Sequence, residues 1–324
     1  MLKSGKKILC NVIISLRSMP SSSGLGFVSR TTSSRVIENA LDRAPQATET
    51  LIPEGRIVAW NLAMVLFHAL LAIVTLSTSN LSLTVKVYRT TIDFVPRFAN
   101  DTSRGWDLVP GYAEGGSLPL AYLVILFFAL SATFHLLNAT LLRDFYIRNL
   151  AMCKTPTRWI EYSISAPIMM IVIAYSLGIR DRATLLSLAV LVGITMPFGY
   201  WTEEIARPVN ETTWNRPLLV RLYPWFLGHI PQTAAWFLVI WQFYDSVGDN
   251  LDRAPWFVSV ILWGELLLFF SFGAAALLSQ ISPPKEFYRG EILFQILSLV
   301  SKGLLGLLMI TNVLMLSRFD DAYD

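Results

Sequence analysis

Seven long apolar stretches, separated by polar segments, dominate the pattern of this chain. A helix needs about 20 mostly apolar residues to cross the hydrocarbon core of a membrane. Because a spanning segment must satisfy its own backbone hydrogen bonds, we expect each stretch to form a helix. The pattern therefore predicts an all-α membrane protein, a bundle of seven transmembrane helices over 57–79, 118–142, 159–179, 183–201, 218–244, 255–279 and 291–316.

The polar segments predict how the rest of the chain is organised. The longest connection, about 80–117, holds turn residues and an alternating stretch from Leu81 to Tyr88 that predicts a short hairpin. We expect a basic tail over 1–54, a helical domain over 55–318 and an acidic tail over 319–324. The first 37 residues hold many serines and no acidic residue, which fits either a disordered tail or an organelle targeting segment.

Basic residues are distributed unevenly between the two sides of the predicted bundle. Cytoplasmic segments of membrane proteins carry an excess of lysine and arginine. The loop after the second span holds four basic residues, and the N-terminal tail holds eight: Lys3, Lys6, Lys7, Arg17, Arg30, Arg35, Arg43 and Arg56. The opposite side is richer in aspartate. We therefore predict a cytoplasmic N-terminus and an outer C-terminus, in the plasma membrane or an endomembrane.

Composition agrees with a membrane protein surrounded by a lipid bilayer. Apolar residues make up 54% of the chain and charged residues 15%, and the mean hydropathy is +0.51. The small net charge of +3 is spread among loops, which argues against a nucleic-acid partner. Cys10 and Cys153 form no CxxC motif, so we expect neither a disulfide framework nor a metal site.

Lys302 lies in the middle of the last predicted span, flanked by leucine and valine. An ionisable group at this depth is costly unless it is paired, so it marks a candidate functional site. One interpretation is a structural ion pair with a carboxylate on another helix. The other is a reactive amine that forms a Schiff base with an aldehyde.

A protonated Schiff base requires an anionic partner, and two carboxyl groups are candidates. Glu161 lies on the third span and Glu265 near the middle of the sixth. Ser165 lies one turn after Glu161 on the same face, where it can donate to the carboxylate or to the Schiff base. Arg158, one turn before Glu161, is in position to keep that carboxylate ionised.

Further polar residues recur at helical spacing on other spans. Ser131, His135 and Asn138 share one stripe of the second span, and His68 stands alone in the first. Ser298 lies one turn before Lys302. Each histidine fits either a packing role or a proton-carrying role.

Together these residues resemble the heliorhodopsins, a family of retinal-binding seven-helix proteins. The resemblance extends from about residue 55 to the C-terminus and rests on the third-span run RWIEYSIS with the other polar positions: Arg158, Glu161, Tyr162, Ser165, Ser131, His135, His68, Glu291, Ser298, Ser301 and Lys302. It implies a rhodopsin-like fold, all-trans retinal on Lys302 in the dark, and Glu161 as the counterion. It further implies a polar cluster made of Ser131, Ser165, Ser298, His68 and His135, and a homodimer. Residues 1–50 and Glu265 have no counterpart in the family pattern.

The resemblance favours a light sensor with a slow photocycle, an unknown signalling partner and no enzymatic activity. Light-driven proton pumps of the microbial rhodopsin type commonly carry a donor acid eleven residues after the helix-three carboxylate, where this chain has Val172. They also carry a second counterion four residues before the lysine, where this chain has Ser298. The alternative is a proton channel that uses Glu265, His68 and His135. A chemoreceptor of the G-protein-coupled type is disfavoured, because the DRY and NPxxY motifs are absent.

Overall fold

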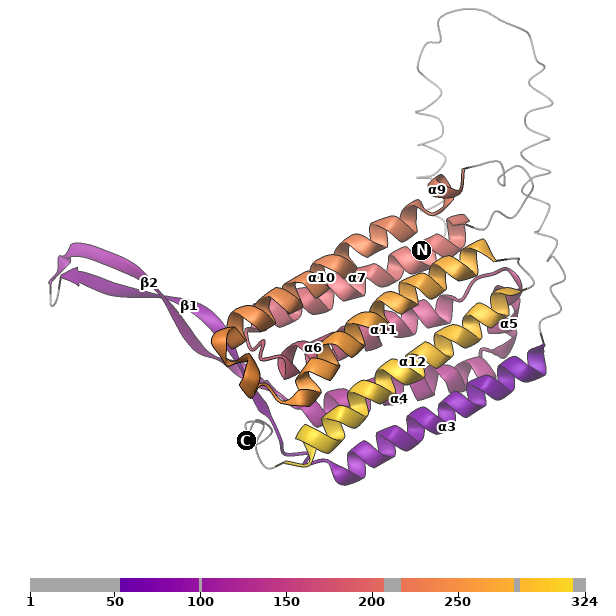
Figure 1. The fold of residues 1–324 in the computed structure, drawn as a ribbon, viewed down its shortest axis with the longest axis horizontal. Coiled ribbons are helices and arrows are strands. Elements are labelled where there is room, and N and C mark those ends of the chain that lie inside the picture. Colours follow the sequence, from indigo (N-terminus) through magenta and orange to yellow (C-terminus); the bar gives the residue numbers. More distant parts are fainter. Residues whose placement is uncertain (1–52, 99–100, 207–216, 283–285, 317–324) are drawn as a thin grey trace, which may run out of the picture. The chain divides into compact units, whose positions relative to one another are not determined.

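Long helices lying side by side form the body of the protein (Figure 1). The computed structural model describes residues 53–98, 101–206, 217–282 and 286–316, which belong to one compact unit. Within them, seven long helices match the seven predicted spans: α3 (Glu54–Thr78), α4 (Leu120–Ala139), α6 (Pro156–Ser176), α7 (Arg182–Ala206), α10 (Tyr223–Val247), α11 (Trp256–Ile281) and α12 (Phe287–Met309). The predicted bundle is confirmed, with helix ends shifted by a few residues.

Three short elements lie between these helices: α5 (Arg143–Ala151), α9 (Leu218–Arg221) and η1 (Gly248–Arg253). A π-helical turn, η3 (Ile310–Leu314), continues α12 at its end. Among the described residues, six helices are long and apolar enough to span a membrane, and α10 is not among them. α10 has 25 residues, but His229 and Gln232 reduce its apolar character. The predicted tails and Cys10 lie outside the described residues.

A β-hairpin joins α3 to α4 and is much longer than the sequence predicted. Strands β1 (Val85–Phe98) and β2 (Asp101–Leu118) pair antiparallel, with Val85 opposite Leu118. The alternating stretch Leu81 to Tyr88 therefore does not fold back on itself. Its inward residues, Leu83, Val85 and Val87, are buried in the main core instead. The Tyr88 N–H donates to the Arg180 carbonyl at 2.9 Å, which ties the hairpin to the α6–α7 connection.

Close helix packing positions α12 in the bundle. Gly306, one turn after Lys302, lies against the ring of Phe128 on α4, and a Cβ at this position would overlap that ring. The glycine therefore allows α12 to approach α4 beside the lysine. α6 contributes the most deeply buried surface, including Val172 and Ile173. This arrangement places the polar residues of α4, α6 and α12 in one interior region.

Candidate functional site

Lys302 lies at the centre of a buried polar cluster. Its side chain extends from α12 and is almost fully buried. The amine Nζ lies 2.7 Å from Oε1 of Glu161 on α6 and donates to the Ser298 hydroxyl at 3.0 Å. The Tyr162 ring lies alongside, with its centroid 5.0 Å from the amine. The structure thus brings together a buried amine and a carboxylate from separate helices.

Glu161 receives its second hydrogen bond from α4. The Ser131 hydroxyl donates to the same Oε1 atom at 2.5 Å. The sequence predicts that Ser165, one turn along the same helix, bonds either the carboxylate or the Schiff base. The buried Ser165 hydroxyl has no hydrogen-bond partner among the described residues. The hydroxyl that binds the carboxylate therefore comes from a neighbouring helix, and the bond to the Schiff base stays a prediction.

The two predicted membrane histidines stack on each other beside this cluster. The rings of His68 and His135 are nearly parallel, with centroids 5.7 Å apart. His135 Nδ1 makes a 2.9 Å hydrogen bond with the Asn61 side-chain oxygen. Neither ring nitrogen of His68, nor the side-chain oxygen of Asn138, has a partner among the described residues. Sequence reasoning missed Asn61, although it lies two turns before His68 on the same face of α3.

Arg158 has different partners from the one predicted. Its guanidinium forms ion pairs with Glu291 on α12 and Glu203 on α7, not with Glu161. It also lies over the Phe294 ring, 3.7 Å from the centroid. The Arg158 guanidinium therefore pairs with two carboxylates on other helices and not with the single carboxylate one turn along its own helix. Glu203 was missed because, near the end of a span, it has the appearance of an ordinary loop charge.

This ion-pair group is tied into the surrounding helices by further hydrogen bonds. The Thr155 backbone N–H donates to Glu203 at 2.7 Å, and the Tyr146 hydroxyl donates to Glu291 at 2.8 Å. Arg158, Glu203 and Glu291 are all buried. The group therefore joins α6, α7, α12 and α5 on the side of Glu161 toward the start of α6.

We expect Arg158→Ala to destabilise the protein strongly. Removing one partner of a buried ion pair leaves uncompensated charge, a loss of about 3–5 kcal/mol in the free energy of unfolding. Arg143→Ala is the matched control, because the Arg143–Glu54 pair is about half exposed and such pairs contribute about 0–1 kcal/mol. Unfolding in mixed detergent micelles measures both. Equal losses in the two variants would contradict the structural role of the Arg158 group.

Glu265, the alternative predicted counterion, does not contact Lys302. Its side chain is fully buried on α11, and its Oε2 accepts a hydrogen bond from Ser301 at 2.7 Å. Among the ion pairs of the described residues, Lys302 is joined to Glu161 alone. The geometry therefore favours Glu161 over Glu265 as the anionic partner.

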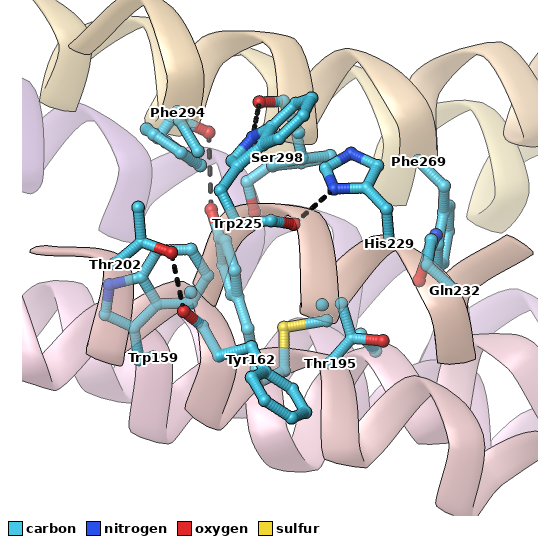
Figure 2. Close-up of a pocket in the computed structure, with 18 of the residues that line it drawn as sticks. Trp159, Tyr162, Thr195, Thr202, Trp225, His229, Gln232, Phe269, Phe294 and Ser298 are labelled. Carbon is cyan, nitrogen blue, oxygen red and sulfur yellow. Dashed lines mark hydrogen bonds between the residues drawn. The ribbon is translucent and has the colours of Figure 1, made fainter. Parts of the chain in front are cut away.

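A largely apolar cavity lies next to the lysine. Lys302, Ser298, Ser301 and Ser165 contribute to its wall, and most of the remaining wall is aromatic or aliphatic. Figure 2 shows side chains from α6, α7, α10, α11 and α12 pointing toward the shared space, among them Trp159, Trp225 and Phe269. The space measures about 790 Å³ including its open mouth.

The cavity wall fits a long apolar aldehyde attached to Lys302. Gly199 on α7 leaves room for the Trp159 ring, which a Cβ at that position would overlap. The unpartnered Ser165 hydroxyl lines the same space as the amine. Apolar walls with one reactive amine and a few hydroxyl groups match the chemistry of retinal, a polyene with a single aldehyde.

The fold of this chain is similar to that of two solved rhodopsins. A cyanorhodopsin from the cyanobacterium Tolypothrix sp. superposes with a TM-score of 0.54 at 8% identity, covering 83% of this chain and 98% of that one. The thermophilic rhodopsin from Rubrobacter xylanophilus superposes with a TM-score of 0.50 at 13% identity, covering 79% and 95%. At such identities these likenesses show the fold alone.

Sequence comparison identifies the family. A search of curated proteins finds no match. The heliorhodopsin family model, in contrast, matches residues 57–314, which include every long helix but the first turn of α3. This match covers well over half of the chain and contains the lysine, its carboxylate partner and the polar cluster. The chain therefore belongs to the heliorhodopsin family.

Proposed function

We propose that this protein is a light-sensing photoreceptor that carries all-trans retinal on Lys302 and has a slow photocycle without ion pumping. Membership of the heliorhodopsin family makes it a multi-pass membrane protein of the retinal-binding rhodopsin type. When bound, retinal supplies a light-absorbing imine at the lysine nitrogen. The observation that carries the proposal is the 2.7 Å contact between Lys302 and Glu161 beside an apolar cavity.

The side chains around Lys302 have distinct tasks in this proposal. Glu161 acts as counterion, because a carboxylate within hydrogen-bond range favours the charged form of the nitrogen. Ser131 donates a hydrogen bond to the Glu161 oxygen that faces the nitrogen, and the Ser298 hydroxyl lies 3.0 Å from the same nitrogen. Tyr162, whose hydroxyl donates to the Phe294 carbonyl at 3.3 Å, forms one side of the site. Arg158 and Glu291 support the site from the neighbouring ion-pair group.

The residues near Lys302 that are able to carry a proton favour sensing over pumping. Val172, at the position of the donor acid in pumps, is fully buried and cannot carry a proton. Ser298 occupies the place of their second counterion. A proton leaving the lysine nitrogen meets Glu161, whose carboxylate is hydrogen-bonded to Ser131, and His135, one turn after Ser131, is bound to Asn61. Light energy is then retained as a change in helix packing that an unknown signalling partner detects.

An absorption spectrum tests the proposed function directly. We expect a visible band after expression of the full chain with all-trans retinal, because an imine with a buried carboxylate partner stays protonated. A flash should bleach the band promptly, and the band should recover slowly in the dark. A protein that binds no retinal, and so shows no visible band, would reject the photoreceptor function.

A light-gated proton channel is the second candidate function. The observation that favours it is the presence of further buried ionisable groups in the bundle: the stacked histidines of α3 and α4, and Glu265 on α11. Such groups are able to relay protons through the membrane. A sustained photocurrent that reverses with voltage would establish the channel function. The absence of such a current would favour the sensor function.

We expect glycosylation to report the proposed orientation, with the N-terminus inside. Asn80, in the sequon Asn80-Leu-Ser82, is an unsuitable acceptor because its side chain donates to the Leu316 carbonyl at 3.1 Å. The informative sequons begin at Asn100 and Asn210, both outside the described residues. Expression in a glycosylating host should modify Asn100 and spare Asn210. Modification of Asn210 would contradict the orientation.

We further propose that the protein forms a homodimer in the plasma membrane or an endomembrane, as family membership implies. For the tails, residues 1–54 and 319–324, the proposal rests on composition alone, because both lie almost entirely outside the described residues. The first is a basic tail, either disordered or a targeting segment, and the second is a short acidic tail.

A further inference from the structure

Glu265 is the buried carboxyl group that the proposed function leaves without a task. It lies on α11 with no solvent-exposed surface. Oε2 accepts one hydrogen bond, from the Ser301 hydroxyl, and Oε1 has no partner among the described residues. The neighbouring Gly264 lies against Leu304 of α12, so the two helices approach closely here. Glu265 does not itself line the cavity.

Positive charge is directed away from Glu265. Three cationic side chains are buried among the described residues, and all have other partners. Lys302 pairs with Glu161, Arg158 pairs with Glu203 and Glu291, and Arg221 donates to the Ala206 carbonyl. On α10, the imidazole of His229 bonds to the Trp225 carbonyl. No salt bridge of the described residues includes Glu265. Among the described residues, the Ser301 hydroxyl is therefore the one partner of the Glu265 carboxyl group.

A single hydroxyl does not compensate an ionised carboxylate at this depth. Burying an unpaired charge costs several kcal/mol or more, and the group neutralises instead. Glu161 shows the contrast, because its oxygen has both an amine at 2.7 Å and a serine hydroxyl at 2.5 Å. The same residue type is thus held in two opposite electrostatic settings, on neighbouring faces of α12.

Ser301 links Glu265 to the lysine. It directly precedes Lys302 in the chain, and both side chains line the cavity. A displacement of α12 at Lys302 therefore changes the Ser301–Glu265 hydrogen bond. We propose that Glu265 is a neutral, protonated carboxylic acid in the resting protein, and that Ser301 couples it to movement at the retinal lysine. The second half of this inference rests on the proposed function, and the first does not.

Infrared spectroscopy in the dark tests the protonation state without any bound retinal. The full chain in lipid nanodiscs should show the carbonyl band of a protonated carboxylic acid that shifts in D₂O. Glu265→Gln should remove this band, because the amide is a neutral isostere. Ser301→Ala should move the band to higher wavenumber, because the carboxyl loses its hydrogen bond. Glu161→Gln, the matched control, should leave the Glu265 band in place.

The outcomes separate clearly. If Glu265→Gln instead removes a carboxylate band, the group is ionised and the inference is wrong. If the glutamine variant does not fold, the protonation state is measured instead by nuclear magnetic resonance of the unsubstituted protein with carbon-13-labelled glutamate. A chemical shift of a neutral carboxyl group supports the inference, and a spectrum of carboxylates alone overturns it.

Illumination tests the coupling. In pigment containing retinal, we expect the Glu265 carbonyl band to shift in the light-minus-dark spectrum, with the shift absent in Glu265→Gln and altered in Ser301→Ala. A pigment whose Glu265 band is unaffected by light would overturn the coupling. A protein that shows the dark band but takes up no retinal would refute the proposed function while leaving the protonated acid established.

Discussion

Lys302→Ala is expected to abolish the visible absorption band completely while leaving a folded bundle. The amine is the attachment point for the aldehyde, and in the described structure it is the buried lysine that lines the cavity. Removing it also removes a buried cation, so Glu161 then takes up a proton instead of remaining an unpaired charge. The measurement is the absorption spectrum after reconstitution with all-trans retinal, together with the helical circular dichroism signal.

The double variant Lys302→Met with Glu161→Gln is the control for folding. It replaces both members of the ion pair by neutral groups of similar volume, a change that is often tolerated in buried pairs. It should be as helical as the unsubstituted protein but colourless, like Lys302→Ala. A visible band that survives in either variant would show that retinal is attached elsewhere.

Glu161→Gln is expected to shift the absorption band to longer wavelength and to let the bound imine lose its proton at lower pH. A carboxylate beside the nitrogen stabilises its charged form. The carboxylate also concentrates the positive charge at the nitrogen end of the polyene. Neutralising Glu161 lets that charge spread, which narrows the excitation gap, and makes the proton easier to release. A pH titration of the visible band measures both effects.

Two matched variants define how specific the effect of Glu161 is. Ser131→Ala should produce a smaller shift in the opposite direction, because the carboxylate oxygen that loses this hydrogen bond presents more negative charge to the nitrogen. Glu265→Gln should change the band little, because Glu265 has no contact with the lysine. If Glu265→Gln alone moves the band, the counterion assignment is wrong and the channel function gains support.

The helical bundle and the central ion pair were predictable from sequence. Spans of about 20 apolar residues have one stable solution in a bilayer, a helix, so the pattern determined the seven helices. A lysine in the last span is equally visible, because charge at that depth stands out against leucine and valine. Its partner was narrowed to Glu161 or Glu265, and contact across helices decided between them.

The sequence did not predict which helix supplies the partner of a buried polar side chain. Spacing along α6 offered Ser165 and Arg158 as partners of Glu161, but Ser131 of α4 supplies the hydroxyl and Arg158 turns to Glu203 and Glu291. Helical periodicity shows which residues share a face, but it gives no information about the distance to the next helix.

The sequence by itself determined the membrane class, the number of helices, the buried lysine and the family resemblance. Only the tertiary structure decided which carboxyl group faces the lysine, which one remains with a single serine, and how far the hairpin extends. The physical reason is the range of the interactions. Hydrophobic periodicity is a local property of the chain, whereas hydrogen bonds and ion pairs depend on ångström distances between residues far apart in sequence. Lys302 and Glu161 are 141 positions apart, yet their atoms lie 2.7 Å from each other.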